Sequence, residues 1–244
     1  MSNYNNKIVG IGCDFQTESD ENSRKLAIES LSGGEQQRVS WMIKNMHHNK
    51  VFKYKAQNKS DNEKKDLLKE LSDAYLLYRE NWKNQPLRSF KNELYGNQFK
   101  EKQFSPLCFD LEVASVCDLA CGFCYRQYIS TPDKIMKKEL AFKLIDQASK
   151  LAVPSMKFNW RGEPLLNPKL PQIIDYAKKK GILETIINTN ATKLDTKTSE
   201  EIIKSGLDIM IYSFDGGTKE TYEKMRPGRF SKNNFDDIYN NILN

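Results

Sequence analysis

The sequence predicts an α/β protein whose C-terminal part is a partial parallel (β/α) barrel, preceded by a mostly helical N-terminal extension. Residues 106–244 alternate β-rich runs with amphipathic segments, in units of ~30 residues. Such alternation implies right-handed crossovers and a parallel sheet or barrel wall. Residues 1–105 are instead polar, rich in Asn, Lys and Glu, and have few strand-like runs. We therefore expect two parts, residues 1–105 and 106–244.

The N-terminal extension is expected to be helical over residues 63–82. Apolar side chains recur there at helical spacing between charges, at Leu67, Leu71, Tyr75 and Tyr78. A second helix is expected over residues 87–95, ended by Gly96, and residues 51–61 are expected to form a loop.

Four strands and four helices are expected in the C-terminal part. The β-rich runs are residues 107–113, 155–160, 185–188 and 209–214. The helical segments, two of which end at a glycine, are residues 138–151, 168–180, 196–205 and 235–243. In parallel sheets the chemistry gathers at the carboxyl ends of the strands. The residues that follow each strand are therefore the candidate site.

Three cysteines follow the first predicted strand. Cys117, Cys121 and Cys124 have the spacing CxxxCxxC, with no fourth cysteine close by. Three thiolates on one loop can hold three irons of a 4Fe–4S cluster and leave the fourth iron open to a small molecule. Phe123 offers a flat side chain beside which a purine ring can lie. The alternative is part of a zinc site, but structural zinc requires four ligands and neither histidine is near in sequence.

Polar groups also follow the other three strands. In the run Trp-Arg-Gly-Glu-Pro-Leu after the second strand, Gly162 allows close backbone approach, Glu163 presents a carboxylate and Pro164 fixes the turn. Residues 188–192 supply amide and hydroxyl groups that can bond sugar hydroxyls, and residues 213–217 supply a Ser/Asp pair. One concave site built from these groups suits an amino-acid-like head, a ribose and an adenine.

The cysteine motif and the Gly-Glu-Pro motif, ~40 residues apart, together resemble those of the radical SAM superfamily. The resemblance covers residues 107–243. It implies a 4Fe–4S cluster on the three cysteines and S-adenosyl-L-methionine (SAM) as the second cofactor. It also implies that SAM is cleaved reductively to a 5′-deoxyadenosyl radical, which abstracts hydrogen from a small-molecule, sugar or peptide substrate. An electron donor such as flavodoxin or ferredoxin is the implied partner.

The same resemblance assigns roles to individual residues. It implies that Gly162, Glu163 and Pro164 bind the SAM amino group. The polar residues after the later strands are implied to contact the ribose, and Arg226 the SAM carboxylate. The ribose set is Asn188, Asn190 and Ser213.

The family core has six strand–helix units, whereas this sequence shows four, and similar members often carry a further C-terminal cluster domain. We therefore expect the chain to be a core domain that is truncated at its C-terminal end. The alternative to an active enzyme is a truncated module that binds the cluster and SAM without turnover.

Structural interpretations of the same residues stay open. Glu163 can be an ordinary loop carboxylate, and Asn188 and Asn190 are typical turn residues. Asp215 can cap a helix that begins near residue 218. Arg226 can be a surface residue.

A competing motif lies in the N-terminal part. Residues 31–38, Leu-Ser-Gly-Gly-Glu-Gln-Gln-Arg, match the signature loop of ABC-type ATPases. That loop acts together with a phosphate-binding GxxxxGK[ST] loop, which this sequence lacks. The alternative is a helix start, with Ser32 as the cap and Glu35 as its capping-box partner.

Composition narrows the class of protein. The net charge is +6 over 244 residues, but the lysines are scattered among acids, which is typical of a solvated surface, so no nucleic-acid role is expected. Mean hydropathy is −0.69, and no apolar run reaches the ~18 residues of a membrane span. Five cysteines, three of them clustered, do not resemble a disulfide framework, so we expect a reducing cytoplasm.

Overall fold

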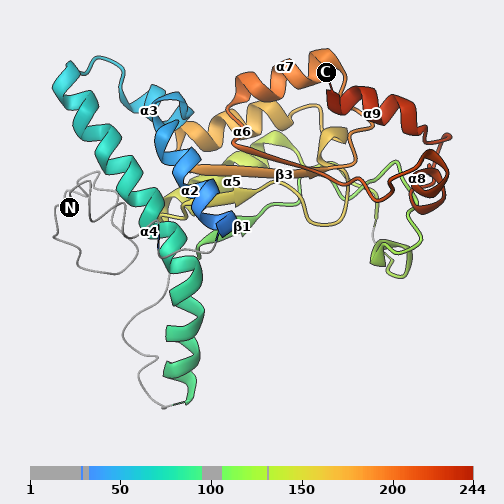
Figure 1. The fold of residues 1–244 in the computed structure, drawn as a ribbon, viewed down its shortest axis with the longest axis horizontal. Coiled ribbons are helices and arrows are strands. Elements are labelled where there is room, and N and C mark those ends of the chain that lie inside the picture. Colours follow the sequence, from blue (N-terminus) through green and yellow to red (C-terminus); the bar gives the residue numbers. More distant parts are fainter. Residues whose placement is uncertain (1–28, 30–32, 95–105, 131, 244) are drawn as a thin grey trace. The chain divides into compact units, whose positions relative to one another are not determined.

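The computed structural model describes residue 29 and residues 33–94, 106–130 and 132–243. The chain forms two compact units (Figure 1). The first comprises Met1–Cys108 and Ala148–Pro154, and the second comprises Phe109–Gln147 and Ser155–Asn244. The predicted division between residues 105 and 106 borders a stretch outside the described residues, so it stays a prediction.

The described part of the first unit is helical, as the sequence predicts. It contains α2 (Gly33–Lys44), the short 3-10 helix η1 (Met46–His48), α3 (Lys50–Lys55) and α4 (Asp61–Leu94). Their fully buried or nearly buried apolar side chains include Val39, Met42, Met46, Val51, Leu67, Leu71, Tyr75 and Tyr78. No described helix combines the length and the apolarity that a membrane crossing requires.

Helix α4 corrects one prediction. The break expected between residues 82 and 87 is wrong, because a single helix runs from Asp61 to Leu94 through Pro86. Proline removes one backbone hydrogen bond of a helix, but it does not force the helix to end there. At the start of α4 the Ser60 N–H donates to Glu63 Oε2 (2.8 Å), and the Glu63 N–H donates to Ser60 Oγ (3.4 Å). This capping box fixes the first turn.

The loop expected over residues 51–61 is wrong in its first half. Helix α3 covers Lys50–Lys55, because Asn49 caps it with its side chain (Val51 N to Asn49 Oδ1, 2.9 Å) and Val51 is buried. A cap and one buried contact thus outweigh the polar composition of this stretch.

The ATPase-like motif contributes a structural contact. Helix α2 covers Gly33–Lys44, so most of the motif is helical, whereas the proposed cap, Ser32, lies outside the described residues and the helix start stays a prediction. The carboxylate of Glu35 forms an ion pair with the buried guanidinium of Arg79 on α4.

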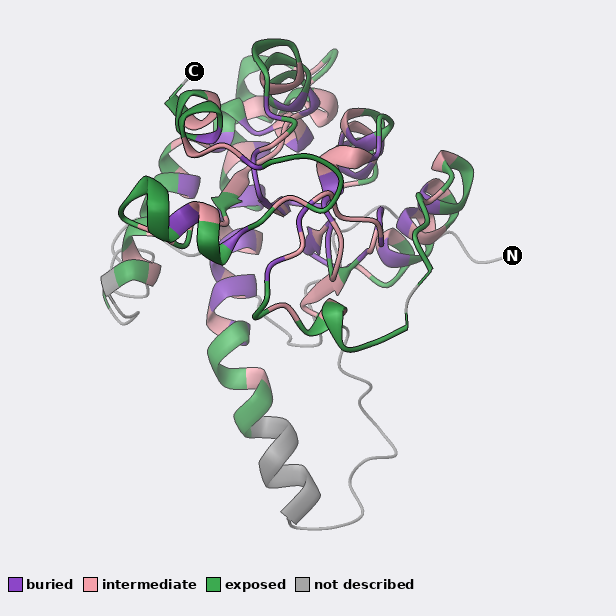
Figure 2. Cartoon of the chain, turned by 90° about the vertical axis from the view of Figure 1, so that its right-hand side faces the viewer, coloured by how far each residue is buried: buried purple, intermediate pink, exposed green. Residues whose placement is uncertain are grey.

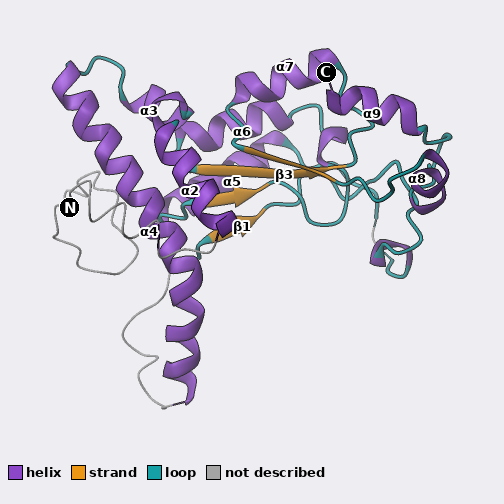
Figure 3. Ribbon diagram, viewed as in Figure 1, coloured by secondary structure: helices purple, strands orange, loops and turns teal. Residues whose placement is uncertain are grey.

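The described part of the second unit is built on one sheet with the strand order β1–β2–β3–β4 (Figure 3). The strands are β1 (Cys108–Asp110), β2 (Ser155–Lys157), β3 (Glu184–Thr189) and β4 (Ile209–Tyr212). The β2–β3 and β3–β4 pairs are parallel, with Ser155 opposite Glu184 and Ile186 opposite Ile209. The predicted α/β class is therefore confirmed. Each strand appears at its expected place, but β1, β2 and β4 end earlier than predicted.

Helices follow the strands as the sequence predicts. They are α5 (Lys138–Lys150), α6 (Leu170–Lys179), α7 (Thr196–Ser205), α8 (Lys219–Met225) and α9 (Phe235–Leu243). Helices α6 and α7 lie side by side on one face of the sheet (Figure 1). Strands β2 and β3 are mostly buried, whereas the outer turns of the helices are exposed (Figure 2). The largest fully buried side chains here include Met156, Phe158, Ile173, Ile174 and Tyr222.

A buried ion pair ties α6 to the start of β4. The ammonium of Lys178, which is fully buried, pairs with Asp208 and also donates to the Leu183 carbonyl (2.9 Å). The same Asp208 carboxylate accepts the Thr185 N–H (2.7 Å). We predict that Lys178→Met lowers the free energy of unfolding by about 3–5 kcal/mol, because it leaves the Asp208 charge buried without its cation. Urea denaturation measures this loss.

The adjacent Lys179 is the matched control for that substitution. It pairs with Asp175 on the exposed side of the same helix. Lys179→Met should cost much less stability, because exposed pairs contribute little. Equal losses in the two variants would contradict a special role for the buried pair.

Candidate active site

The three predicted cluster ligands lie on the cysteine loop (residues 117–124), between β1 and α5. Cys121 is buried, and Cys117 and Cys124 are half-buried. The loop is folded tightly, because the Cys124 N–H donates to the Cys121 carbonyl (3.0 Å). Among the described residues, no group of three or more His, Cys, Asp or Glu side chains has the arrangement that a single metal ion requires. That finding concerns one ion, whereas the cysteines of a cubane cluster each bind a different iron.

Burial changes the acidity of two of these thiols. It raises the pKa of Cys117 to about 11, and it raises the pKa of Cys121 above its ordinary value while the nearby Arg226 cation acts in the opposite direction. Without metal both thiols are therefore protonated at neutral pH. Metal binding must release these protons, since thiolates are the ligands.

Residues 226–229, Arg-Pro-Gly-Arg, lie against the cysteine loop, and we call them the RPGR segment. The Ala120 N–H donates to the Pro227 carbonyl and the Arg229 N–H donates to the Asp118 carbonyl, both at 2.8 Å. Leu119 and Gly228 form an antiparallel β-bridge between these two bonds. The segment that follows α8 therefore holds the cysteine loop in place through its backbone.

Arg226 reaches from the RPGR segment to a cysteine. It is only 8% exposed, so the interpretation as a surface residue is wrong. Its Nε donates to Asp215 Oδ2 (2.7 Å), NH1 donates to Cys121 Sγ (3.8 Å), and its guanidinium carbon lies 5.5 Å from the ring centre of Phe123. Asp215 is likewise not the cap of α8, which is Thr218. The Asp215 carboxylate instead orients an arginine toward the cysteine loop.

The end of β3 contacts the other side of the cysteine loop. Asn190 Nδ2 donates to Asp118 Oδ1 (2.9 Å) and lies 3.9 Å from Cys117 Sγ as a second, weaker donor contact. The hydroxyl of Thr192 donates to the second oxygen of Asp118 (2.6 Å). Sequence reasoning did not single out Asp118, which lies inside the cysteine motif and accepts both bonds. Two sulfurs of the loop thus receive N–H donors from residues that follow β3 and β4.

Gly162, Glu163 and Pro164 form the GEP segment, which packs against the start of the cysteine loop. A Cβ atom on Gly162 would lie 2.2 Å from the Ala114 carbonyl oxygen and 2.5 Å from that of Val116, so only glycine fits. The Glu163 N–H donates to the Val116 carbonyl (2.9 Å). Pro164 is buried and begins the 3-10 helix η4 (Pro164–Leu166).

The carboxylate of Glu163 points into the protein. It is 3% exposed and accepts three hydrogen bonds, from Leu165 N (3.1 Å), Thr189 Oγ1 (2.7 Å) and Asn190 N (2.8 Å). Glu163 therefore joins the GEP segment to the end of β3. The bonds to Thr189 and Asn190 show that it is more than an ordinary loop carboxylate.

Burial raises the pKa of Glu163 to about 7 from 4.5, against its hydrogen bonds, which lower it. Since the folded-state pKa is raised, the stability contribution is full below pH 4.5 and is lost as pH rises through 7. We predict that the metal-free protein loses about 2–3 kcal/mol of unfolding free energy between pH 5 and pH 8 from this group. In Glu163→Gln this part of the pH dependence should disappear. A pH profile unchanged by the substitution would contradict the assignment.

The predicted ribose residues lie at neighbouring strand ends. The Asn188 N–H donates to the Asn159 side chain (2.9 Å), and the Ser213 N–H donates to the Thr189 carbonyl (2.8 Å). The side-chain oxygen of Asn188 is buried and has no hydrogen-bond partner. Such an orphaned acceptor is rare in a folded protein and indicates a place for a donor from outside the chain. A ribose hydroxyl or an ammonium supplies such a donor, so Asn188 fits SAM.

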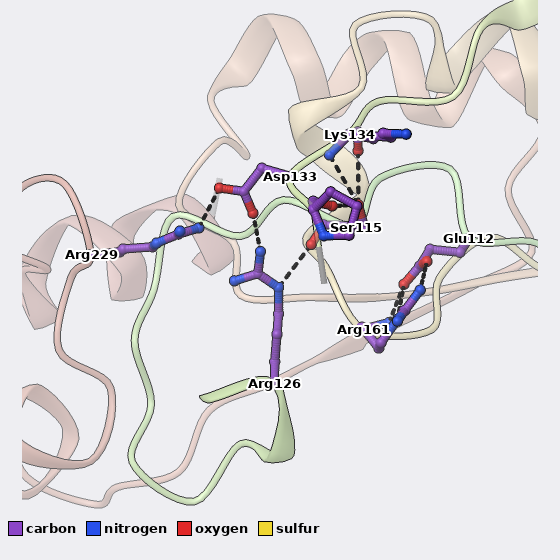
Figure 4. Close-up of polar contacts among 8 residues, drawn as sticks. Glu112, Ser115, Arg126, Asp133, Lys134, Arg161 and Arg229 are labelled. Atoms are coloured by element: carbon purple, nitrogen blue, oxygen red, sulfur yellow. Dashed lines mark hydrogen bonds and ion pairs between the residues drawn. The ribbon is translucent and has the colours of Figure 1, made fainter. Parts of the chain in front are cut away.

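A second set of contacts braces the residues after Cys124 (Figure 4). Asp133 pairs with Arg126 and with Arg229 of the RPGR segment, where Arg229 NH1 lies 2.8 Å from Asp133 Oδ2. Arg126 Nε also donates to the Ser115 carbonyl (2.8 Å). The RPGR segment therefore holds both the cysteine loop and the chain that leaves it. None of this network was expected from the sequence.

Comparison with known proteins bears on the family. The model of the Radical SAM superfamily matches residues 111–242. The chain belongs to the radical SAM superfamily. The match includes the cysteine loop, the GEP segment and the RPGR segment, and it confirms the predicted family and fold.

The chain is similar in sequence to two curated proteins over part of its length. The chain is 32% identical over 108 residues to the tungsten-containing aldehyde ferredoxin oxidoreductase cofactor-modifying protein of Pyrococcus furiosus, covering 43% of this chain and 30% of that protein. It is 28% identical over 135 residues to a probable GTP 3′,8-cyclase of Methanococcus maripaludis, covering 55% and 42% respectively. The match thus spans less than half the length of these relatives.

Solved structures of radical SAM type are also similar. Native anSMEcpe with bound AdoMet has a TM-score of 0.48 and 19% identity, over 57% of this chain and 40% of that one. Streptococcus suis SuiB bound to S-adenosylmethionine has a TM-score of 0.46 and 21% identity, over 87% of this chain and 45% of that one.

Proposed function

We propose that the chain is a radical SAM enzyme that ligates a 4Fe–4S cluster through Cys117, Cys121 and Cys124. When bound, the cluster supplies the electron that cleaves SAM to methionine and a 5′-deoxyadenosyl radical, which abstracts hydrogen from the substrate. The observation that carries the proposal is the pair of N–H donors on the sulfurs of Cys117 and Cys121. Hydrogen bonds to cluster sulfurs from surrounding side chains are a means by which proteins orient and tune such clusters.

The other residues of the site bind and position SAM on this proposal. Asn188 offers its orphaned side-chain oxygen, and Arg226 offers a cation beside the cysteine loop for the SAM carboxylate. Ser213 supplies a hydroxyl at the next strand end, and Phe123 presents a half-exposed ring for the adenine. Phe123 lies within the cysteine loop and Asn188 near the end of β3, whereas Ser213 follows β4 and Arg226 follows α8.

The role of Glu163 on this proposal is to hold the GEP segment where it meets SAM. Its carboxylate accepts three hydrogen bonds from the protein, so the segment is fixed before any ligand arrives. A preorganised segment costs less entropy on binding than a mobile one. Asn190 is shared between this carboxylate and Asp118, which couples the GEP segment to the cysteine loop.

The reaction needs one electron from outside the chain. We propose a flavodoxin or ferredoxin as its donor and a reducing cytoplasm as its setting, since the cluster ligands must stay reduced thiols until metal binds.

Anaerobic reconstitution followed by reduction with dithionite tests the function. We expect SAM to be converted to 5′-deoxyadenosine and methionine in equal amounts, measured by liquid chromatography. The variant with all three cysteines replaced by alanine should form neither product. SAM binding without 5′-deoxyadenosine would instead support a binding module without turnover, and would overturn the enzymatic proposal.

A further inference from the structure

A cavity of about 430 Å³ lies next to the cysteine loop, and none of the residues assigned to SAM lines it. Its walls come from the ends of β1 and β2 and from the chain just after Cys124. Three of its lining side chains are large and apolar yet exposed, namely Trp160 (62%), Tyr125 (47%) and Ile129 (40%). Exposed aromatic side chains gathered on one concave surface are typical of a ligand site.

The charged side chains that line this cavity differ in whether they already have a partner within the chain. The guanidinium of Arg161 is held by Glu112 through Nε (2.9 Å) and NH2 (2.5 Å), which neutralises it (Figure 4). Asp110 also lines the cavity and already has a partner within the chain. Among the described residues, the ammonium of Lys157 has no hydrogen-bond or ion-pair partner. The cavity therefore offers one uncompensated cation.

A second donor lies beside that cation. Lys157 and Asn159 are two residues apart on the extended chain at the end of β2, so their side chains leave the same face. The side-chain oxygen of Asn159 accepts the Asn188 N–H, which leaves its amide nitrogen to donate elsewhere. One ammonium and one amide N–H match the two oxygens of a carboxylate.

We propose that this cavity is the substrate site, and that it takes a molecule with a flat ring and a carboxylate. The carboxylate pairs with Lys157 and Asn159, and the ring packs on Trp160. The identity of this ligand as the substrate rests on the proposed function, but the binding site itself does not. It lies beside the cysteine loop, where a radical formed on SAM would need its target.

Fragment binding to the metal-free chain tests the site. Indole-3-acetate and indole-3-acetamide have nearly the same shape but differ in charge, and saturation-transfer NMR measures both. We expect the acid to bind at least tenfold more tightly than the amide. Lys157→Met should remove this preference, and Trp160→Ala should weaken both ligands. Lys134→Met, which changes a lysine outside this cavity, is the matched control and should leave the preference intact.

Several outcomes would overturn the proposal. They are equal binding of acid and amide, an unchanged preference in Lys157→Met, and failure of both fragments to bind at millimolar concentration. Displacement of the bound acid by SAM would assign the cavity to the cofactor instead. The variant without its three cysteines should bind the fragments as the wild type does, so this test stands even if SAM cleavage fails.

Discussion

Replacing any one of Cys117, Cys121 and Cys124 by alanine is expected to abolish the 4Fe–4S cluster after anaerobic reconstitution. Each cysteine binds its own iron in a cubane cluster, so a missing thiolate leaves a second iron without a protein ligand. The described part of the cysteine loop offers no other thiol that could replace it. Iron and acid-labile sulfide per chain, together with the visible absorption of the cluster, measure the loss.

Cys108→Ala is the control for these variants. Cys108 is a half-buried cysteine on β1, outside the CxxxCxxC motif. It should keep the full cluster content. Stoichiometric zinc without iron in wild-type protein that was purified anaerobically would contradict the cluster assignment and support the zinc alternative.

Gly228→Ala is expected to reduce cluster content several-fold, although it changes no cysteine. A Cβ atom at position 228 would lie 1.6 Å from the Ser231 carbonyl oxygen, which is backbone and cannot rotate away. The RPGR segment must therefore shift, and its hydrogen bonds to Asp118 and Ala120 must lengthen or break. Overpacking of this kind costs about 1–3 kcal/mol or more. Hydrogen exchange at the Ala120 amide and iron content report the two effects.

Gly217→Ala is the matched control for that substitution. It lies between β4 and α8, and a Cβ atom there meets nothing within 4 Å. This variant should load its cluster as the wild type does. If Gly228→Ala also loads fully and keeps the Ala120 amide protected, the RPGR segment does not hold the cysteine loop.

Elements fixed by local signals could be predicted from the sequence. Helix α7 spans Thr196–Ser205 as predicted, because Asp195 caps it (Thr198 N to Asp195 Oδ1, 2.7 Å) and Gly206 ends it. Strand β2 ends early for a reason that is not local. There the side chain of Asn159 takes the Asn188 N–H in place of a backbone carbonyl. Such a replacement depends on two strands meeting, which a single sequence does not reveal.

The residues of the candidate site also fall into two groups, those that local sequence signals predict and those that only long-range contacts place. The cysteines and the GEP segment could be found because their residue types and spacing are distinctive along the chain. Arg226 could not be placed, because its contact with Cys121 joins residues 105 positions apart. The role of Asp215 was missed for the same reason. The only local signal for the RPGR segment was a glycine after a proline, which is equally typical of an ordinary turn.

The proposed function requires that the cysteine loop carries a cluster with an iron open to SAM. Electron paramagnetic resonance of the reconstituted, dithionite-reduced protein, titrated with SAM, measures whether SAM reaches that iron. We predict that SAM changes the spectrum of the reduced cluster at saturation. Asn188→Ala, which removes the orphaned acceptor, should need a higher SAM concentration for the same change. A reduced cluster whose spectrum is identical with and without SAM would contradict the account.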